Sequence, residues 1–225
     1  MTEKISLIIP CKNEVESLGA VLDEVKDNKF VDEIIVVIDS EEDNSIPIAK
    51  KFDCKLIVQK NKGYGSAIIE GIKYSKSKYS VILDGDGSKN PIYIYNLYKA
   101  IEDSNDEFIF GSRYGKNSGS DDDTILTHFG NRLFTNFGKL IFKIKINDIL
   151  HTFFICKTDK FKKLNFKYSN FAFCAELPIL INKLEIPHSE IPTFERKRIA
   201  GKVKVNSFID GFIILISMIN LIFKK

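Results

Sequence analysis

Short apolar runs alternate with helix-like segments through the first half of the chain, and this alternation restricts the fold more than any other feature. Strands are expected near residues 5–9, 33–38, 56–58, 81–83 and 108–110, with helices over 14–26, 46–52, 66–74 and 92–101. Such a series predicts an α/β fold, with a largely parallel sheet covered by helices on both faces. A length of 225 residues suits one domain of this kind.

The second half of the chain is less regular, and its pattern predicts fewer strands. The expected elements are a polar loop over 114–124, a long phenylalanine-rich helix over 125–144, a strand over 152–156, a helix over 171–184 and an edge strand over 189–194. The edge position is expected because Pro192 has no backbone N–H to donate within a sheet.

The chain closes with an apolar tail, in which residues 211–223 are interrupted only by Ser217 and Asn220 before two lysines. A helix that spans a membrane needs about 20 apolar residues, so this one is too short to cross. Two interpretations stay open. The tail lies in a membrane interface with its lysines toward anionic headgroups, or it packs against the domain or a partner chain.

Charge and cysteine content narrow the classes of protein further. The net charge of +3 gives no signal for nucleic-acid binding, although basic residues gather in the C-terminal third, where they face anionic lipid, phosphate or only solvent. Four cysteines without a CxxC pair argue against zinc and against a disulfide framework. The first residues do not resemble a signal peptide, so we expect a cytoplasmic protein, or one held peripherally on the cytoplasmic face of a membrane.

The strand expected over 81–83 ends in two aspartates, Asp84 and Asp86, with Gly85 between them. Ligands of open α/β sheets bind at the carboxyl ends of the strands, where this loop lies. Two adjacent carboxylates repel each other unless a cation joins them, and Mg²⁺ and Mn²⁺ prefer oxygen ligands. The segment therefore predicts either a site for a metal and a diphosphate or an ordinary polar turn.

Four more polar loops follow expected strands and should meet at the same edge of the sheet. They are residues 10–14 (Pro-Cys-Lys-Asn-Glu), 39–43 (Asp-Ser-Glu-Glu-Asp), 61–65 (Asn-Lys-Gly-Tyr-Gly) and 111–114 (Gly-Ser-Arg-Tyr). Lys62 beside Gly63 suits phosphate, because glycine lets a ligand approach the backbone. Arg113 suits a second phosphate. Ile68 stands where a dinucleotide fingerprint needs glycine, and no P-loop is present in the sequence.

Taken together, these five loops in this order resemble the family 2 glycosyltransferases, which have the GT-A fold. Within that family the chain looks most like the dolichyl- or polyprenyl-phosphate hexosyltransferases. The narrower resemblance continues through residues 130–133 (Gly-Asn-Arg-Leu), Asp148, 176–177 (Glu-Leu), 190–192 (Glu-Ile-Pro), and Arg198 with 201–202 (Gly-Lys). It implies one GT-A domain over 1–204, with a nucleotide-sugar half over 1–114, an acceptor half over 115–204 and a tail helix over 205–225.

The resemblance also implies an activity and a set of site residues. The activity is a metal-dependent, inverting transfer of a hexose from a UDP- or GDP-linked sugar to a polyprenyl phosphate. The donor would be held by Pro10, Lys12, Glu14, Asp39, Lys62, Gly63, Asp84, Gly85 and Asp86, and Mg²⁺ or Mn²⁺ by Asp84, Asp86 and Ser88. Phosphates would meet Arg113, Arg196, Arg198 and Lys202, and the catalytic residues would be Asp86, Arg113 and Asp148.

Two questions about the acceptor remain open from the sequence. A phosphate acceptor is already ionised and needs no strong base, whereas a hydroxyl acceptor in glycan synthesis needs one, for which Asp148 is the candidate. His151 either faces the acceptor or is a structural histidine.

The sequence also leaves room for two different classes of protein. One is a non-catalytic, transferase-like domain that only binds a partner. The other, less favoured, is a sugar-phosphate nucleotidyltransferase, which would need a glycine-rich basic loop after Ile9 that the chain lacks.

Overall fold

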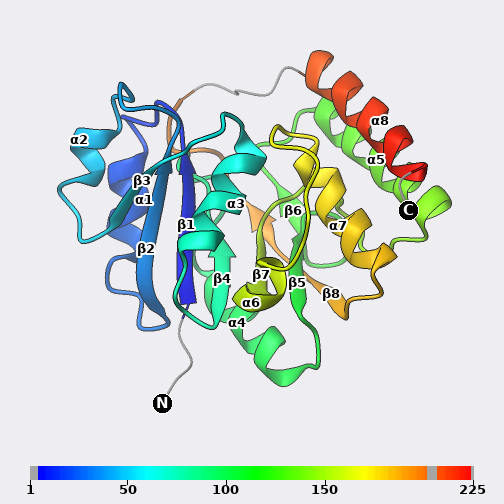
Figure 1. Cartoon of the computed structure of the whole chain (residues 1–225), viewed down its shortest axis with the longest axis horizontal. Helices are drawn as coiled ribbons and strands as arrows, with labels where there is room; N and C mark the ends of the chain where they lie inside the picture. Colours follow the sequence, from blue (N-terminus) through cyan, green and yellow to red (C-terminus); the bar gives the residue numbers. More distant parts are fainter. Residues whose placement is uncertain (1–4, 202–206, 224–225) are drawn as a thin grey trace.

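The computed structural model describes residues 5–201 and 207–223, and its centre is a sheet of seven strands in the order β3-β2-β1-β4-β7-β5-β8 (Figure 1). The strands are β1 (Ile5–Cys11), β2 (Val31–Ile38), β3 (Lys55–Val58), β4 (Tyr79–Ile82), β5 (Phe108–Ser112), β7 (Phe154–Lys157) and β8 (His188–Pro192). Strand β7 runs antiparallel to both of its neighbours, and the remaining neighbours pair in parallel. The expected mostly parallel α/β sheet is confirmed.

Helices cover both faces of the sheet, and each face has its own apolar core. Helices α1 (Leu18–Val25), α2 (Ile46–Ala49) and α4 (Tyr93–Asp103) pack on one face. Helices α3 (Tyr64–Tyr74), α5 (Ile125–Phe142), α6 (Thr158–Phe161), α7 (Phe173–Lys183) and α8 (Ile209–Ile222) contribute to the core on the other.

Strand β2 shows why an uninterrupted apolar run was the right signal for a central strand. Ile35 and Val37 enter the core with α3 and α7, whereas Ile34, Val36 and Ile38 enter the core with α1 and α4. Because successive side chains point to opposite faces, a strand buried on both sides needs apolar residues at every position.

Pro10 was expected to end the first strand, but β1 continues through it to Cys11. The reason lies in the neighbouring strand. Leu83 donates its backbone N–H to the Ile8 carbonyl, and β4 pairs with β1 only as far as Ile8. The missing N–H of Pro10 falls where β4 has already ended, so no ladder hydrogen bond is lost.

The loop expected over 114–124 contains a short strand, β6 (Gly119–Ser120), which pairs in parallel with β9 (Phe194–Glu195). A bridge between Lys89 and Glu195 joins the same segment to the loop after β4. Strand β8 is the last strand of the large sheet, as its proline predicted. This arrangement brings residues near 89, 120 and 195 together at one edge of the sheet.

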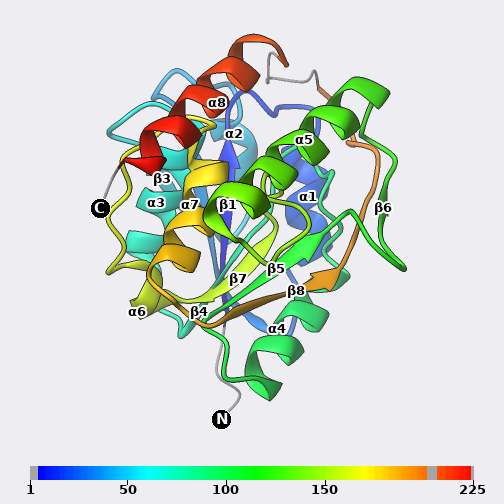
Figure 2. The same cartoon turned by 90° about the vertical axis from the view of Figure 1, so that its right-hand side faces the viewer.

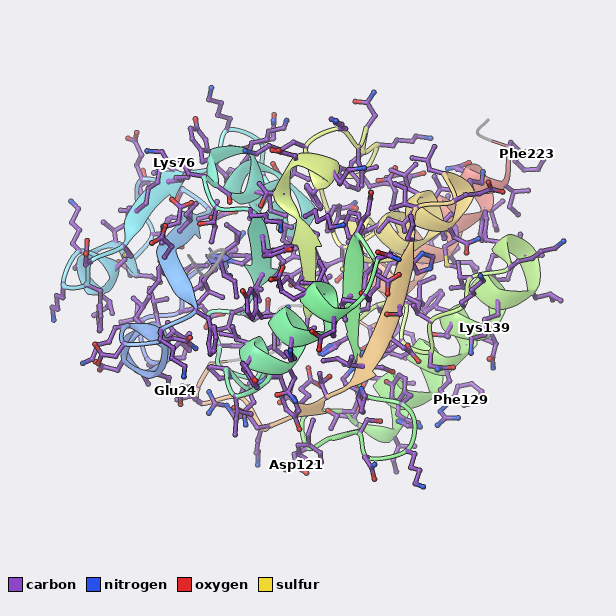
Figure 3. All side chains as sticks on the ribbon, turned by 90° about the horizontal axis from the view of Figure 1, so that it is seen from below. Glu24, Lys76, Asp121, Phe129, Lys139 and Phe223 are labelled. Atoms are coloured by element: carbon purple, nitrogen blue, oxygen red, sulfur yellow. The ribbon has the colours of Figure 1, made fainter. Side chains whose placement is uncertain are left out.

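Helices α5 and α8 lie side by side beyond the upper edge of the sheet in Figures 1 and 2. Large apolar side chains remain exposed on both helices, and we call this surface the α5–α8 face. Its most exposed members include Ile125, Phe129, Leu133 and Leu140 on α5 and Phe212 and Ile216 on α8. Figure 3 shows Phe129 and Lys139 projecting from the rim of the molecule. Among the described residues, no helix is long and apolar enough to cross a membrane.

Candidate active site

The carboxyl ends of β1, β2 and β3 enclose a pocket of about 620 Å³. It is lined by Pro10, Cys11, Lys12, Asn13, Asp39, Gln59, Lys62, Gly63, Tyr64, Ala67 and Phe171. We call it the first pocket. Five of the residues expected to hold a nucleotide, Pro10, Lys12, Asp39, Lys62 and Gly63, therefore lie together although they come from three separate loops.

Asp39 is the polar centre of the first pocket. Gln59 donates from Nε2 to an Asp39 carboxylate oxygen at 2.9 Å, and the Lys12 ammonium lies 3.1 Å from the other oxygen. On the opposite side, Phe171 stacks on Tyr64 with ring centroids 5.1 Å apart. A pocket with a hydrogen-bonding carboxylate and a flat aromatic wall suits a planar base joined to a polar sugar.

Gly63 has a structural role at the mouth of this pocket. Its φ of +127° is a conformation that side-chain-bearing residues rarely adopt, and a Cβ atom there would lie 2.3 Å from the Ser169 carbonyl oxygen. Ser66 donates its backbone N–H to the same carbonyl. The glycine therefore lets the segment that carries Phe171 close over the pocket.

A second pocket, of about 290 Å³, adjoins the first and shares Pro10, Tyr64 and Phe171 with it. Its lining includes Asp84, Asp86, Ser88, Lys89, Arg113 and Arg198. Side chains of α5 and Ile214 of α8 also contribute to this lining. The aspartate loop thus lies in the second pocket, next to the pocket suited to a nucleotide.

The two aspartates are held by different partners. Tyr64 donates its hydroxyl to one Asp84 oxygen at 2.8 Å, and Lys89 lies 3.0 Å from the other. One Asp86 oxygen accepts the Ser88 backbone N–H at 3.0 Å, and the other lies 3.5 Å from Arg198. Burial, and next the neighbouring charge of Asp84, raise the pKa of Asp86 above its ordinary value.

These residues fit a divalent metal. The two carboxylates offer oxygen ligands in the second pocket, and a cation would relieve the repulsion that, after burial, raises the pKa of Asp86. Within the described ranges, no group of three or more His, Cys, Asp or Glu side chains could hold a metal by itself. Mg²⁺ or Mn²⁺ would therefore be shared between the aspartates and oxygens of a bound diphosphate.

Lys89 is the functional residue that the sequence analysis missed. Its side chain is only 2% exposed, and its ammonium contacts Asp84, the Thr152 hydroxyl at 3.0 Å and the Tyr64 hydroxyl at 3.3 Å. In sequence it follows Ser88 in a polar turn, where a lysine is expected to be solvated. Its position three residues after Asp86 was the one signal in the sequence that could have indicated a role at the site. Buried carboxylates need a compensating positive charge, and a lysine in the same loop can supply it.

The structure does not place Arg113 as a free cation for phosphate. Its guanidinium forms a two-pronged ion pair with Asp148 at 2.7 and 3.0 Å and contacts Glu195 at 3.2 Å. Burial alone would lower the pKa of Arg113, but Asp148 and Glu195 raise it well above its ordinary value. Arg113 stays charged and fastens β5 to the segments that carry Asp148 and Glu195.

Asp148 does not fit the role of general base. Its side chain has no exposed surface, and both oxygens accept hydrogen bonds from Arg113. A base must reach the proton that it removes, and Asp148 lies behind Arg113 rather than in the lining of either pocket. The burial of Asp148 and its ion pair with Arg113 therefore argue against the expected base role, and residue spacing gave no sign of this pairing.

The basic segment after β9 divides into residues with different surroundings. Arg196 donates to the Gly87 carbonyl at 2.6 Å and to Glu24, so it supports the aspartate loop from behind. Arg198 lines the second pocket, where it pairs with Asp122 and approaches Asp86. Of the two, Arg198 lies in the lining of a pocket and Arg196 does not. Lys202, the third expected cation, lies outside the described residues.

Glu14 and His151 take buried positions beside the site. Glu14 accepts a hydrogen bond from Ser17 at 3.2 Å and packs beneath Gly85, so it supports the aspartate loop without lining either pocket. His151 lines the second pocket. Burial first, and then the charges of Arg113 and Lys89, lower the pKa of His151 well below its ordinary value and keep the ring neutral.

Comparison with known proteins matches both the fold and the sequence. An uncharacterized protein of Methanocaldococcus jannaschii is 33% identical over 117 residues, which are 47% of this chain and 50% of that one. A dolichol-phosphate mannosyltransferase of Pyrococcus furiosus is 36% identical over 121 residues, which are 50% of this chain and 34% of that one. The chain thus spans half or less of the length of these curated relatives.

A crystal structure of glucosyl-3-phosphoglycerate synthase from Mycobacterium tuberculosis, in complex with Mn²⁺, UDP and phosphoglyceric acid, superposes with a TM-score of 0.76. The identity is 13%, and the match covers 98% of this chain and 79% of that one. This similarity confirms the expected GT-A fold. The family model described as glycosyl transferase family 2 matches residues 6–165, and the chain therefore belongs to that family.

Proposed function

We propose that the chain is an inverting hexosyltransferase that uses a divalent metal and moves a hexose from a UDP- or GDP-linked sugar to a polyprenyl phosphate. One observation carries the proposal. The first pocket, which suits a nucleotide, adjoins the second at Pro10, Tyr64 and Phe171, and the second pocket holds Asp84 and Asp86, with Tyr64 donating a hydrogen bond to Asp84. Bond transfer between two substrates needs such a junction, because the reacting atoms must be held close together.

The nucleoside would occupy the first pocket. Asp39, oriented by Gln59 and Lys12, would accept hydrogen bonds from the base or the ribose. The Tyr64–Phe171 pair would form the apolar wall, and Lys62 would meet a phosphate at the pocket mouth. The diphosphate would then lie toward the aspartates, because Pro10 and Tyr64 line both pockets. The Mycobacterium tuberculosis structure with bound UDP supports a nucleotide in this fold.

Asp84 and Asp86 would hold Mg²⁺ or Mn²⁺ together with the diphosphate, and the bound metal would neutralise the charge that builds up on the leaving group. Ser88 orients Asp86 through its backbone N–H, which donates at 3.0 Å. Lys89 and Tyr64 orient Asp84 from the other side. The buried surroundings keep these groups in one arrangement, and a fixed arrangement is what stabilises charge during transfer.

A phosphate acceptor fits the second pocket better than a neutral hydroxyl. Arg198 offers a cation in its lining, and an ionised phosphate oxygen needs no base to attack. The base that a hydroxyl acceptor would require, Asp148, is engaged by Arg113. The Pyrococcus furiosus relative named as a dolichol-phosphate mannosyltransferase supports the same class of acceptor.

The exposed apolar side chains of the α5–α8 face support an acceptor phosphate that is linked to a lipid. Ile214 of α8 and Leu150 line the second pocket beside polar residues of α5, and other, apolar side chains of the same two helices are exposed. Soluble monomers rarely expose apolar patches of this kind without a partner. We therefore include peripheral contact with the cytoplasmic leaflet of a membrane in the proposal, with the lipid phosphate entering between the two helices.

Hydroxyl acceptors form the second candidate class, and one observation favours them. Asp122 and Asp123 line the second pocket, and negative charges repel a phosphate. Both are compensated, however, because Arg198 pairs with Asp122 and the Arg113 guanidinium lies 3.7 Å from Asp123. The compensated charge leaves the phosphate acceptor as the better supported of the two.

A donor screen tests the proposal. Purified protein with Mn²⁺ is incubated with UDP- and GDP-linked hexoses, and release of the nucleoside diphosphate is measured for each. One donor should be hydrolysed or transferred, and Asp86→Ala should remove the signal. Release at an unchanged rate by Asp86→Ala would refute the metal role, and failure with every donor would refute the transferase proposal.

A further inference from the structure

Every carboxylate oxygen of the aspartate pair has a partner supplied by the chain itself. Asp84 faces Lys89 with one oxygen and Tyr64 with the other, and Asp86 faces Ser88 and Arg198. A metal that takes Asp84 as a ligand must therefore share it with, or displace, the Lys89 ammonium 3.0 Å away. Two cations on one carboxylate repel each other strongly at that distance.

Lys89 is held in place by more than this ion pair. Its ammonium also contacts Thr152 at 3.0 Å and Tyr64 at 3.3 Å, and the side chain is only 2% exposed. A buried ammonium that loses its carboxylate is strongly destabilised unless another anion replaces it. The two hydroxyls keep the ammonium in the second pocket beside Asp84, where the proposed function places the donor diphosphate.

We propose that Lys89 competes with the divalent metal for Asp84, so that tight metal binding requires the donor diphosphate, which gives the displaced ammonium another anion. This inference rests on the proposed function, because it assumes that a nucleoside diphosphate binds at the aspartate loop. It assigns Lys89 as a positioning residue that couples the two ligands. The coupling is reciprocal, so the metal and the diphosphate each raise the affinity for the other.

The test measures binding of Mn²⁺ alone, without turnover. Calorimetry of the full chain is run with Mn²⁺ in the absence of nucleotide and again with saturating UDP or GDP. The unsubstituted protein should bind Mn²⁺ at least about tenfold more weakly without nucleotide than with it. Lys89→Met, which keeps the length of the side chain without its charge, should bind Mn²⁺ alone at least about tenfold more tightly than the unsubstituted protein.

Two variants control the comparison. Lys89→Arg keeps the charge and should retain nucleotide-dependent Mn²⁺ binding. Lys99→Gln removes a lysine that pairs with Asp103 at 2.9 Å on the exposed side of α4, so it subtracts the same charge and should change nothing at the site. Thermal unfolding of each variant shows whether it is folded, and a folded Lys89→Met with unchanged affinity for Mn²⁺ alone overturns the inference.

The unsubstituted protein provides an independent test in case Lys89→Met does not fold. Equal Mn²⁺ affinity with and without a bound nucleotide overturns the inference whatever the variants do. If neither UDP nor GDP binds in the presence of Mn²⁺, the proposed function itself fails, and the role of Lys89 fails with it. Nucleotide binding with no effect on Mn²⁺ affinity removes only the inference about Lys89.

Discussion

Arg113 and Asp148 form a buried, two-pronged ion pair at the second pocket, with Nε–Oδ2 and Nη2–Oδ1 distances of 2.7 and 3.0 Å. Arg113 lines this pocket and Asp148 does not, and the pairing gives both residues a structural role. It joins the end of β5 to the segment before β7, and Glu195 ties β9 to the same guanidinium. The wall of the second pocket therefore depends on this ion pair, because Arg113 and Glu195 both line the pocket.

Asp148→Asn tests this structural role. Breaking a buried ion pair by removing one charge costs about 3–5 kcal/mol, which for a chain of this size lowers the melting temperature by about 10 °C. The variant should unfold earlier in thermal denaturation, and the folded fraction should keep its affinity for nucleotide. A variant with an unchanged melting temperature but no transfer activity would instead support a base role.

Asp39→Ala tests the assignment of the first pocket. Removing the carboxylate leaves Gln59 and Lys12 without their shared partner and deletes the acceptor for the base or ribose. Loss of a hydrogen-bonded charged group costs about 1.5–3 kcal/mol, so nucleotide affinity should fall by roughly tenfold to a hundredfold. Calorimetry with UDP and GDP measures it, with Asp53→Ala as a control on an exposed turn. Unchanged affinity would place the nucleotide elsewhere.

The pKa of Asp86 predicts how binding responds to acid. Burial and the charge of Asp84 raise this pKa, and a protonated Asp86 is a poor metal ligand. An ordinary aspartate has a pKa of about 3.9. As the pH is lowered, Mn²⁺-dependent nucleotide binding should therefore begin to weaken at a higher pH than it would if the metal ligand were such an aspartate.

Arg198→Gln tests the sign of this effect. The charge of Arg198 lowers the pKa of Asp86, so its removal raises that pKa further and should move the acid limb of binding to higher pH. Calorimetric titrations of nucleotide with Mn²⁺ across a pH series measure the midpoint. A shift toward lower pH, or no acid limb above the ordinary aspartate range, would contradict the assignment of Asp86 as the ligand.

If the α5–α8 face contacts a membrane, substitutions on it should weaken membrane binding without changing donor hydrolysis. Burying a phenylalanine side chain contributes about 1.5–3 kcal/mol, so Phe129→Ser with Phe212→Ser should weaken binding to anionic vesicles by roughly tenfold or more. Vesicle sedimentation measures this loss. Donor hydrolysis in detergent-free buffer should not change, because both residues lie on the exposed surface. Equal sedimentation of the double variant and the unsubstituted protein would contradict peripheral membrane contact.

The strands and the aspartate loop could be predicted from sequence because both depend on local patterns. Continuous apolar runs such as 34–38 are required wherever a strand is buried on both faces, and Asp84 and Asp86 follow such a run directly. The first pocket was predictable for the same reason, since its loops each follow a parallel strand.

The contacts across the second pocket could not be predicted in the same way. Lys89 meets Thr152, and Arg113 meets Glu195, across separations of 63 and 82 residues. Neither pairing leaves a local pattern, because the first depends on β7 entering the sheet antiparallel between β4 and β5 and the second on β8 pairing with β5. Lys89 lies in a polar turn, where a lysine is expected to be exposed, so the local sequence could not predict its burial.

Transfer of the hexose to a lipid is the reaction that decides between the acceptor classes. The protein is incubated with Mn²⁺, the donor that it consumes and a polyprenyl phosphate in vesicles, and the organic extract is analysed by mass spectrometry. We expect a hexosyl polyprenyl phosphate whose formation requires both the lipid phosphate and Asp86. Consumption of the donor with the hexose found only on a soluble hydroxyl acceptor, and none in the lipid extract, would contradict the proposed function.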